Sequence, residues 1–192
     1  MKKTILIISL ITLISGCASI DYNQMSKGSG ISEIVLQQNC EHITCSYDKL
    51  KDRVQASSND MNVLLGLSGS ETRTIQFTWV NGSNQISVDL FHITLYGSWS
   101  FIKNAEIYVG KEMVAKVDGR VDRRVGYYND VAREHENIEQ VSGLISIAAA
   151  EKIANANYED VTIRFYGKGG YQDVELPRKH DLIYVVNLAK SA

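Results

Sequence analysis

The sequence has neither an excess of basic residues nor, at its N-terminus, an apolar run long enough to cross a membrane. Lys and Arg number 20 against 22 Asp and Glu, so the formal net charge is -2 at pH 7. Dedicated nucleic-acid binders are usually basic, and this balance argues against that class. The apolar stretch Ile5 to Ile14 is too short to span about 30 Å of hydrocarbon as a helix.

Recognisable catalytic and metal-binding motifs are also lacking. No histidine lies in an H-E-x-x-H frame, and no serine lies in a G-x-S-x-G elbow. The glycine-rich stretch 167–170 lacks the spacing of a phosphate loop, although it could form a nest of backbone amides for an anion; a hairpin turn is the interpretation we favour. We therefore expect no metal and no cofactor, and we do not expect an enzyme. The four histidines are His42, His92, His135 and His180.

What the N-terminus does contain is a positive pair, Lys2 and Lys3, a short apolar run, and then Leu-Ile-Ser-Gly followed by Cys17. This order and spacing resemble a bacterial lipoprotein signal peptide. Ile14 stands where the motif most often has Leu. The alternative is an ordinary secretory signal with a chance cysteine. The resemblance implies that residues 1–16 are removed and that Cys17 carries the lipid.

The same resemblance implies a location. Two or three lipid chains on Cys17 would make a durable membrane anchor. Residue 18 is Ala rather than Asp, which in Gram-negative bacteria resembles export to the outer membrane, with the protein domain in the periplasm. The polar segment 17–30 then predicts a flexible tether, and residues 31–192 predict a single domain. The later half also loosely resembles uncharacterised small envelope lipoproteins, which imply no activity.

With Cys17 lipidated, Cys40 and Cys45 remain as a pair in an oxidising compartment, which predicts a disulfide. So short a loop contributes about 2 kcal/mol in the entropy model. The competing interpretation is a metal site that uses His42 between the two cysteines, but the spacing matches no usual zinc knuckle.

Short alternating segments joined by turns predict an α+β fold built on an antiparallel sheet or sandwich. Residues 31–38 are ambiguous between helix and strand, and 49–56 favour a strand. Asn81-Gly82 predicts a hairpin between strands at 72–80 and 86–96, and Asp118-Gly119 predicts another between 113–117 and 120–128. Further strands are expected at 105–109 and 161–166.

One or two helices are expected in the C-terminal half. Residues 142–155 are rich in alanine with an apolar stripe, Ser142 can cap the first turn, and Asn157 can take the left-handed position after the last. After Pro177, apolar residues between 182 and 189 follow helical spacing, although their β-branched members leave a final strand as the alternative.

Two functional hypotheses remain. The first is a non-catalytic, membrane-anchored envelope module that binds or assembles with an envelope protein. The second is an envelope hydrolase, for which Glu134 or Glu136, His135 and Asp173 are weak candidates. A deep pocket that gathers a carboxylate and a histidine would favour the hydrolase, whereas a filled sandwich would favour the binding module. Arg120, Arg123 and Arg124 could gather around an anion, or simply pair with neighbouring acids.

Overall fold

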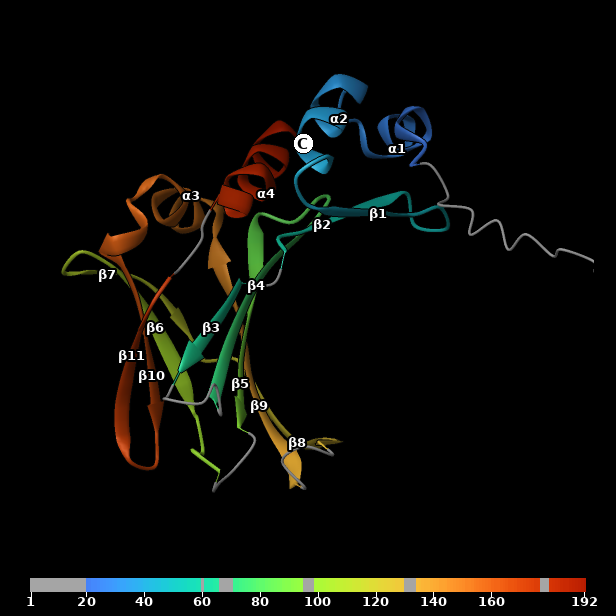
Figure 1. Cartoon of the computed structure of the whole chain (residues 1–192). Coiled ribbons are helices and arrows are strands. Elements are labelled where there is room, and N and C mark those ends of the chain that lie inside the picture. Colours follow the sequence, from blue (N-terminus) through green and yellow to red (C-terminus); the bar gives the residue numbers. More distant parts are fainter. Residues whose placement is uncertain (1–19, 60, 66–70, 95–98, 130–133, 177–179) are drawn as a thin grey trace, which may run out of the picture.

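Two antiparallel sheets form the body of the protein, and the helices gather at one end of them (Figure 1). The structure is a computed structural model that describes residues 20–59, 61–65, 71–94, 99–129, 134–176 and 180–192. The arrangement confirms the expected α+β class with an antiparallel sandwich and two helices in the C-terminal half. Cys17 and the segment that resembles a signal peptide lie outside the described residues.

The larger sheet has seven strands, and most of its neighbours are joined as antiparallel pairs along one path. Strand β3 (Met61–Leu65) lies off this path and pairs with the first half of β4, while β2 pairs with the second half. The order along the path is β1 (Thr44–Asp48), β2 (Arg53–Ser57), β4 (Glu71–Val80), β5 (Gln85–Thr94), β9 (Glu134–Ser146) and β8 (Arg120–Asn129).

The smaller sheet has four strands and packs its inner face against the larger one. Its order is β11 (Gly170–Glu175), β10 (Val161–Gly167), β6 (Asn104–Val109) and β7 (Glu112–Val117). The hairpin between β10 and β11 turns at Lys168-Gly169, and Gly170 adopts a φ of 109°, which side-chain-bearing residues rarely take. The hairpin predicted at 167–170 is therefore confirmed.

Alternation along the strands places the core between the sheets. In β5, every second residue from Ile86 to Thr94 is buried, and β4 buries Ile75, Phe77 and Trp79 in the same way. Because successive side chains of a strand point to opposite faces, these residues share the inner face with the buried members of β6 and β10, which include Ile107, Ile163 and Phe165.

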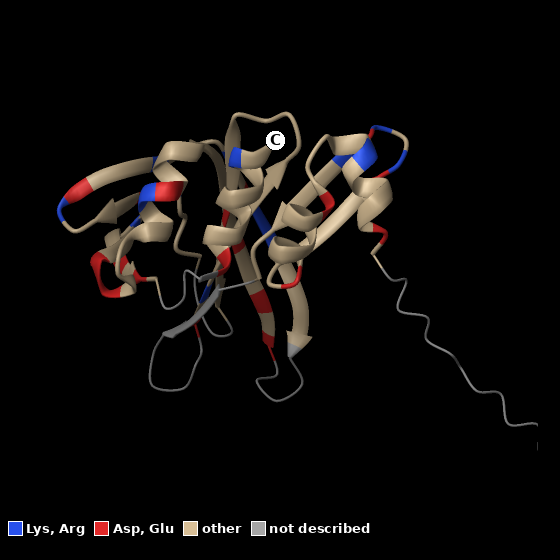
Figure 2. Cartoon of the chain, turned by 90° about the horizontal axis from the view of Figure 1, so that it is seen from above, with Lys and Arg blue, Asp and Glu red and all other residues tan. Residues whose placement is uncertain are grey.

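Four helices cover the end of the sandwich, with acidic and basic positions interspersed over them (Figure 2). They are α1 (Tyr22–Ser29), α2 (Glu33–Cys40), α3 (Ile147–Asn155) and α4 (His180–Ser191). The predicted C-terminal helix is confirmed as α4. The tether expected over 17–30 is wrong from residue 22 onward, because α1 buries Met25 and its Asp21 cap accepts a hydrogen bond from the Gln24 amide.

Two local predictions about the first C-terminal helix fail, and pairing between strands explains why it starts late. Residues 142–146 continue β9, and the helix begins at Ile147 with Ser146 as its cap. Ser142 instead donates its hydroxyl hydrogen to Asp89 on β5 at 2.5 Å. Asn157 has an extended backbone rather than the left-handed one expected.

The segment at Asp118-Gly119 joins β7 to β8, but these strands belong to different sheets, so the predicted hairpin is a crossover. A Cβ on Gly119 would lie 2.5 Å from the Ser142 carbonyl oxygen. The glycine is therefore required by this close approach to β9.

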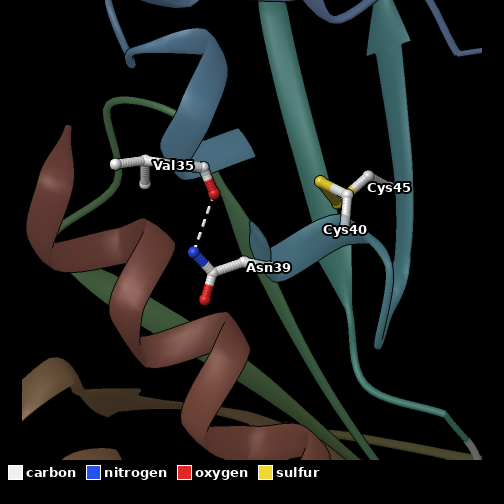
Figure 3. Close-up of a disulfide and its surroundings, with 4 residues drawn as sticks. All are labelled: Val35, Asn39, Cys40 and Cys45. Atoms are coloured by element: carbon white, nitrogen blue, oxygen red, sulfur yellow. Dashed lines mark hydrogen bonds between the residues drawn. A yellow bond between two sulfur atoms is a disulfide. The ribbon is translucent and has the colours of Figure 1, made fainter. Parts of the chain in front are cut away.

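The predicted disulfide joins Cys40, at the end of α2, to Cys45 on β1, with their Cα atoms 5.5 Å apart (Figure 3). The side-chain amide of Asn39, the residue before Cys40, donates to the Val35 carbonyl oxygen one turn back in α2, at 2.8 Å. The His42 ring, which the competing interpretation assigned to a metal site, stacks on Tyr184 of α4 with the ring centroids 4.1 Å apart. The disulfide thus pins the helical end to the first hairpin.

We expect the double variant Cys40→Ser/Cys45→Ser to lose about 2 kcal/mol of unfolding free energy, because the loop no longer constrains the unfolded chain. Urea unfolding followed by circular dichroism measures the loss. Reductant should lower the stability of the parent protein by the same amount and leave the variant unchanged. An equal effect of reductant on both proteins would contradict this assignment.

Candidate functional site

A row of polar side chains crosses the inner face of the larger sheet, beside buried apolar positions such as Ile75. Arg73 on β4 is the cross-strand partner of His92 on β5, His92 is the partner of Glu139 on β9, and Glu139 is the partner of Arg123 on β8. Arg73, His92 and Glu139 are each only 1% exposed. Because buried charges are costly unless they are paired, the partners of each member decide what the row can do.

Glu139 is the best-satisfied member of the row. Its two carboxylate oxygens accept hydrogen bonds from the backbone amides of Ser100, at 2.7 Å, and Ile102, at 3.0 Å, and from Arg123 Nε at 3.0 Å. Arg123 also donates to the Ile102 carbonyl oxygen at 2.6 Å. Between the two amides, Phe101 has a φ of 52°, a left-handed conformation that turns both N–H groups toward one anion.

We call residues 99–103, which precede β6, the strap. The strap also bonds to the smaller sheet: the Lys168 amide donates to the Ser100 carbonyl oxygen at 3.0 Å, and the Lys103 amide donates to the Tyr166 carbonyl oxygen at 2.8 Å. A Cβ on Gly167 would lie 2.5 Å from the Ser100 carbonyl oxygen, so this position requires glycine. The strap therefore ties β9 to the turn between β10 and β11.

The Ser100 hydroxyl lies 2.9 Å from His92 Nε2, within reach for a nucleophile and a base. A histidine that acts as a base is normally oriented through a hydrogen bond from its other nitrogen. His92 Nδ1 is buried and has no partner among the described residues. The nearest carboxylate of the row, Glu139, is occupied by the strap and Arg123.

A cavity of about 570 Å³ lies between the strap, the N-terminal part of β4 and the β10–β11 turn. This volume falls in the range of small-molecule sites. Aromatic rings and glycines supply much of its lining, and Arg73 and Lys168 supply positive charge. The lining residues are Arg73, Trp99, Ser100, Ile102, Phe165, Gly167, Lys168, Gly169, Gly170, Tyr171 and Gln172.

Arg73 is the least satisfied charge that lines this cavity. Its Nη2 donates to Gln172 Oε1, while Nε and Nη1 are buried without a hydrogen-bond partner among the described residues. The guanidinium lies over the Phe165 ring, 5.1 Å from its centroid. Burial lowers the pKa of Arg73 to about 10, against the opposing pull of Glu71 and Glu139, so the group is still charged at neutral pH.

The hydrolase candidates from the sequence are not brought together. His135 on β9 packs edge-on against Tyr128, and Glu136 lies against Gly126. Asp173 is on the other sheet, where both of its oxygens accept from Arg164 at 2.7 and 2.8 Å. The Arg164 hydrogen bonds lower the pKa of Asp173. His135 and Asp173 therefore contact neighbours on their own, different sheets.

The three arginines of β8 do not gather either. Arg123 faces inward to Glu139, and alternation puts Arg120 and Arg124 on the opposite face of the strand. Among the described residues, no group of three or more His, Cys, Asp or Glu side chains is placed to hold a metal ion. No helix in the same ranges has the length and apolar character needed to cross a bilayer.

Arg73 and Glu139 were missed in the sequence, although a signal for both is present. Arg73 lies on the same side of its strand as the apolar Ile75 and Phe77. Glu139 lies on the same side of its strand as Val141. A charged residue that continues the apolar face of a strand must be paired inside the fold or face a site. The alternation along a strand thus identifies a buried charge, but it does not identify the partners of that charge, which come from strands distant in sequence.

We expect Arg73→Met to raise the stability of the protein, on the order of 1 kcal/mol, because it removes a buried charge with unmet donors. Arg123→Met is the matched control, since it removes an arginine from the same row. It should lower stability by about 2 kcal/mol, because Glu139 loses its charged partner. Thermal unfolding of both variants measures the difference. A lower melting temperature for Arg73→Met would show that Arg73 stabilises the fold.

Comparison of the chain with protein-family models, curated proteins and solved structures finds no match. Membership of a particular family therefore stays a prediction. The function must therefore be inferred from the residues that line the cavity.

Proposed function

We propose that the protein is a lipid-anchored bacterial envelope protein that binds a ligand in the cavity between its two sheets and does not act as a catalyst. The observation that carries this proposal is the cavity of about 570 Å³ with the partly unsatisfied Arg73 in its lining. Aromatic and apolar walls with a few polar groups are the usual composition of a binding site. The lipid on Cys17 supplies the anchor, as the resemblance to a bacterial lipoprotein signal peptide implies.

The location proposed is the outer membrane, with the domain in the periplasm and the lipid of Cys17 in the membrane. The disulfide between Cys40 and Cys45 supports an oxidising compartment. Residues 22–29 form a helix that packs on the domain, so any free linker is shorter than the sequence suggests. We therefore propose that the domain works close to the membrane surface.

The alternative of an envelope hydrolase is favoured by one observation, the contact between Ser100 and His92. Binding is favoured over it for two reasons. Neither His92 nor Glu139 lines the cavity, and His92 Nδ1 has no acceptor among the described residues to orient the ring. The cavity also differs from the filled sandwich expected of a binding module, and it gives the ligand a position beside the β10–β11 turn.

We expect Cys17→Ser to abolish labelling by a radioactive fatty acid and to move the protein out of the membrane fraction, because the thiol that accepts the lipid is gone. The double variant Cys40→Ser/Cys45→Ser is the control and should keep the label. Unchanged membrane fractionation of Cys17→Ser would contradict the anchor.

A photo-crosslinking amino acid at Tyr171, which lines the cavity and is 63% exposed, should capture one envelope component repeatedly in intact cells. The matched control is Tyr158, which is 51% exposed and precedes the opposite end of β10. Mass spectrometry of the captured material gives the result. The same products from both positions would contradict binding in the cavity.

A further inference from the structure

The guanidinium of Arg73 has more hydrogen-bonding capacity than the fold uses. Only Nη2 has a partner, the side-chain oxygen of Gln172, and Nε and Nη1 are buried without one among the described residues. Most buried polar groups in proteins are paired, and a guanidinium can donate five hydrogens in one plane. The unmet donors therefore point to a missing acceptor on the cavity side of β4.

The charges of the row do not cancel. Arg73 and Arg123 are positive, and Glu139 is the one carboxylate between them. Glu139 is already bound to Arg123 and to two backbone amides of the strap. One positive charge is thus left at Arg73, and the exposed Lys168 adds a second at the mouth of the cavity. Glu71 and Glu139 are the acids that act on Arg73, and neither forms an ion pair with it.

We infer that the cavity is a carboxylate site, in which Arg73 binds the carboxylate of a ligand whose apolar part lies against Phe165 and Trp99. The inference rests on the proposed function and names the ligand class of the same cavity. Gln172 occupies the position of the acceptor in the free protein, and an entering carboxylate replaces its oxygen at Nη2. The second carboxylate oxygen then accepts from Nη1, the other terminal nitrogen of the same fork.

A monoanion fits this site better than a phosphate. The buried excess is one positive charge, and a phosphate would bring up to two negative charges toward the Glu139 carboxylate. A planar carboxylate also matches the planar guanidinium and leaves the aromatic walls for an apolar group. The class that fits is therefore a monocarboxylate with an adjoining flat or aliphatic group.

The test is a fluorescence titration of the full-length protein with benzoate, its uncharged counterpart benzamide, and inorganic phosphate. The chain has two tryptophans, and Trp79 is buried with its indole N–H bound to the Ser83 carbonyl oxygen. Trp99 lines the cavity and reports on binding there. Benzoate should give a saturable change that Trp99→Phe abolishes, and benzamide should bind at least about tenfold more weakly.

Three variants distinguish a binding role of Arg73 from a structural one. Arg73→Met should lower benzoate affinity at least about tenfold, and Arg73→Lys should restore part of it, because it keeps the charge and loses the fork. Gln172→Ala should raise the affinity, since it removes the competing acceptor. If Arg73 and Gln172 only supported the fold, their substitutions would not change benzoate affinity in opposite directions. Thermal unfolding of each variant shows that it is folded.

Several outcomes would overturn the carboxylate assignment. They are equal affinity for benzoate and benzamide, tighter binding of phosphate than of benzoate, no saturable binding of benzoate, or an affinity that Arg73→Met leaves unchanged. None of these results would refute binding in the cavity itself, because capture of one component from Tyr171 tests that separately. Loss of selective capture from Tyr171 would remove the proposed function and the carboxylate assignment with it.

Discussion

The end of the sandwich that carries the cavity depends on the hydrogen bonds accepted by the buried carboxylate of Glu139. One side chain of β9 accepts hydrogen bonds from two backbone amides of the strap and from Arg123 of the next strand. Without that acceptor, the left-handed conformation of Phe101 would bring two N–H groups together with nothing to bind. The strap in turn bonds to the smaller sheet through Lys168 and Lys103, so hydrogen bonds link the carboxylate to both sheets beside the cavity.

The two ends of the sandwich are closed by different physical means. At the helical end, α3 and α4 pack side chains such as Ile153 and Val185 into the core, and both are fully buried. At the other end, the row of polar residues prevents apolar closure, because each charge needs a specific partner. Glu139 and Arg123 pair with each other, and His92 contacts Ser100 through Nε2 but has no partner at Nδ1 among the described residues. Arg73 bonds only to Gln172, through one of its three nitrogens. A cavity lies beside the member that is least satisfied, which is the pattern expected where stability has been traded for binding.

Sequence reasoning recovered the features that depend on local chemistry. Strand alternation, the Asn81-Gly82 turn, the Cys40–Cys45 disulfide and the last helix all follow from neighbours in the chain. It failed where long-range pairing decides. The composition of residues 142–146 predicts a helix, but β5 pairs with all of them and β8 pairs with Ser142.

The cavity itself could not have been predicted from one sequence for the same reason. Arg73, Glu139 and Gln172 become neighbours only through the strand order and the packing of two sheets. The contact between Ser100 and His92 is a product of that convergence too, and it has a structural explanation. Glu139 fixes the Ser100 amide, so the hydroxyl is brought to the edge of the row, where His92 Nε2 is the polar atom within reach. A catalytic base would need a second polar contact at Nδ1. The one carboxylate of the row, Glu139, is instead bound to the amides of the strap. Arg73 is therefore left as a positive charge without an ion-pair partner beside the cavity, and a buried positive charge of this kind attracts an anion.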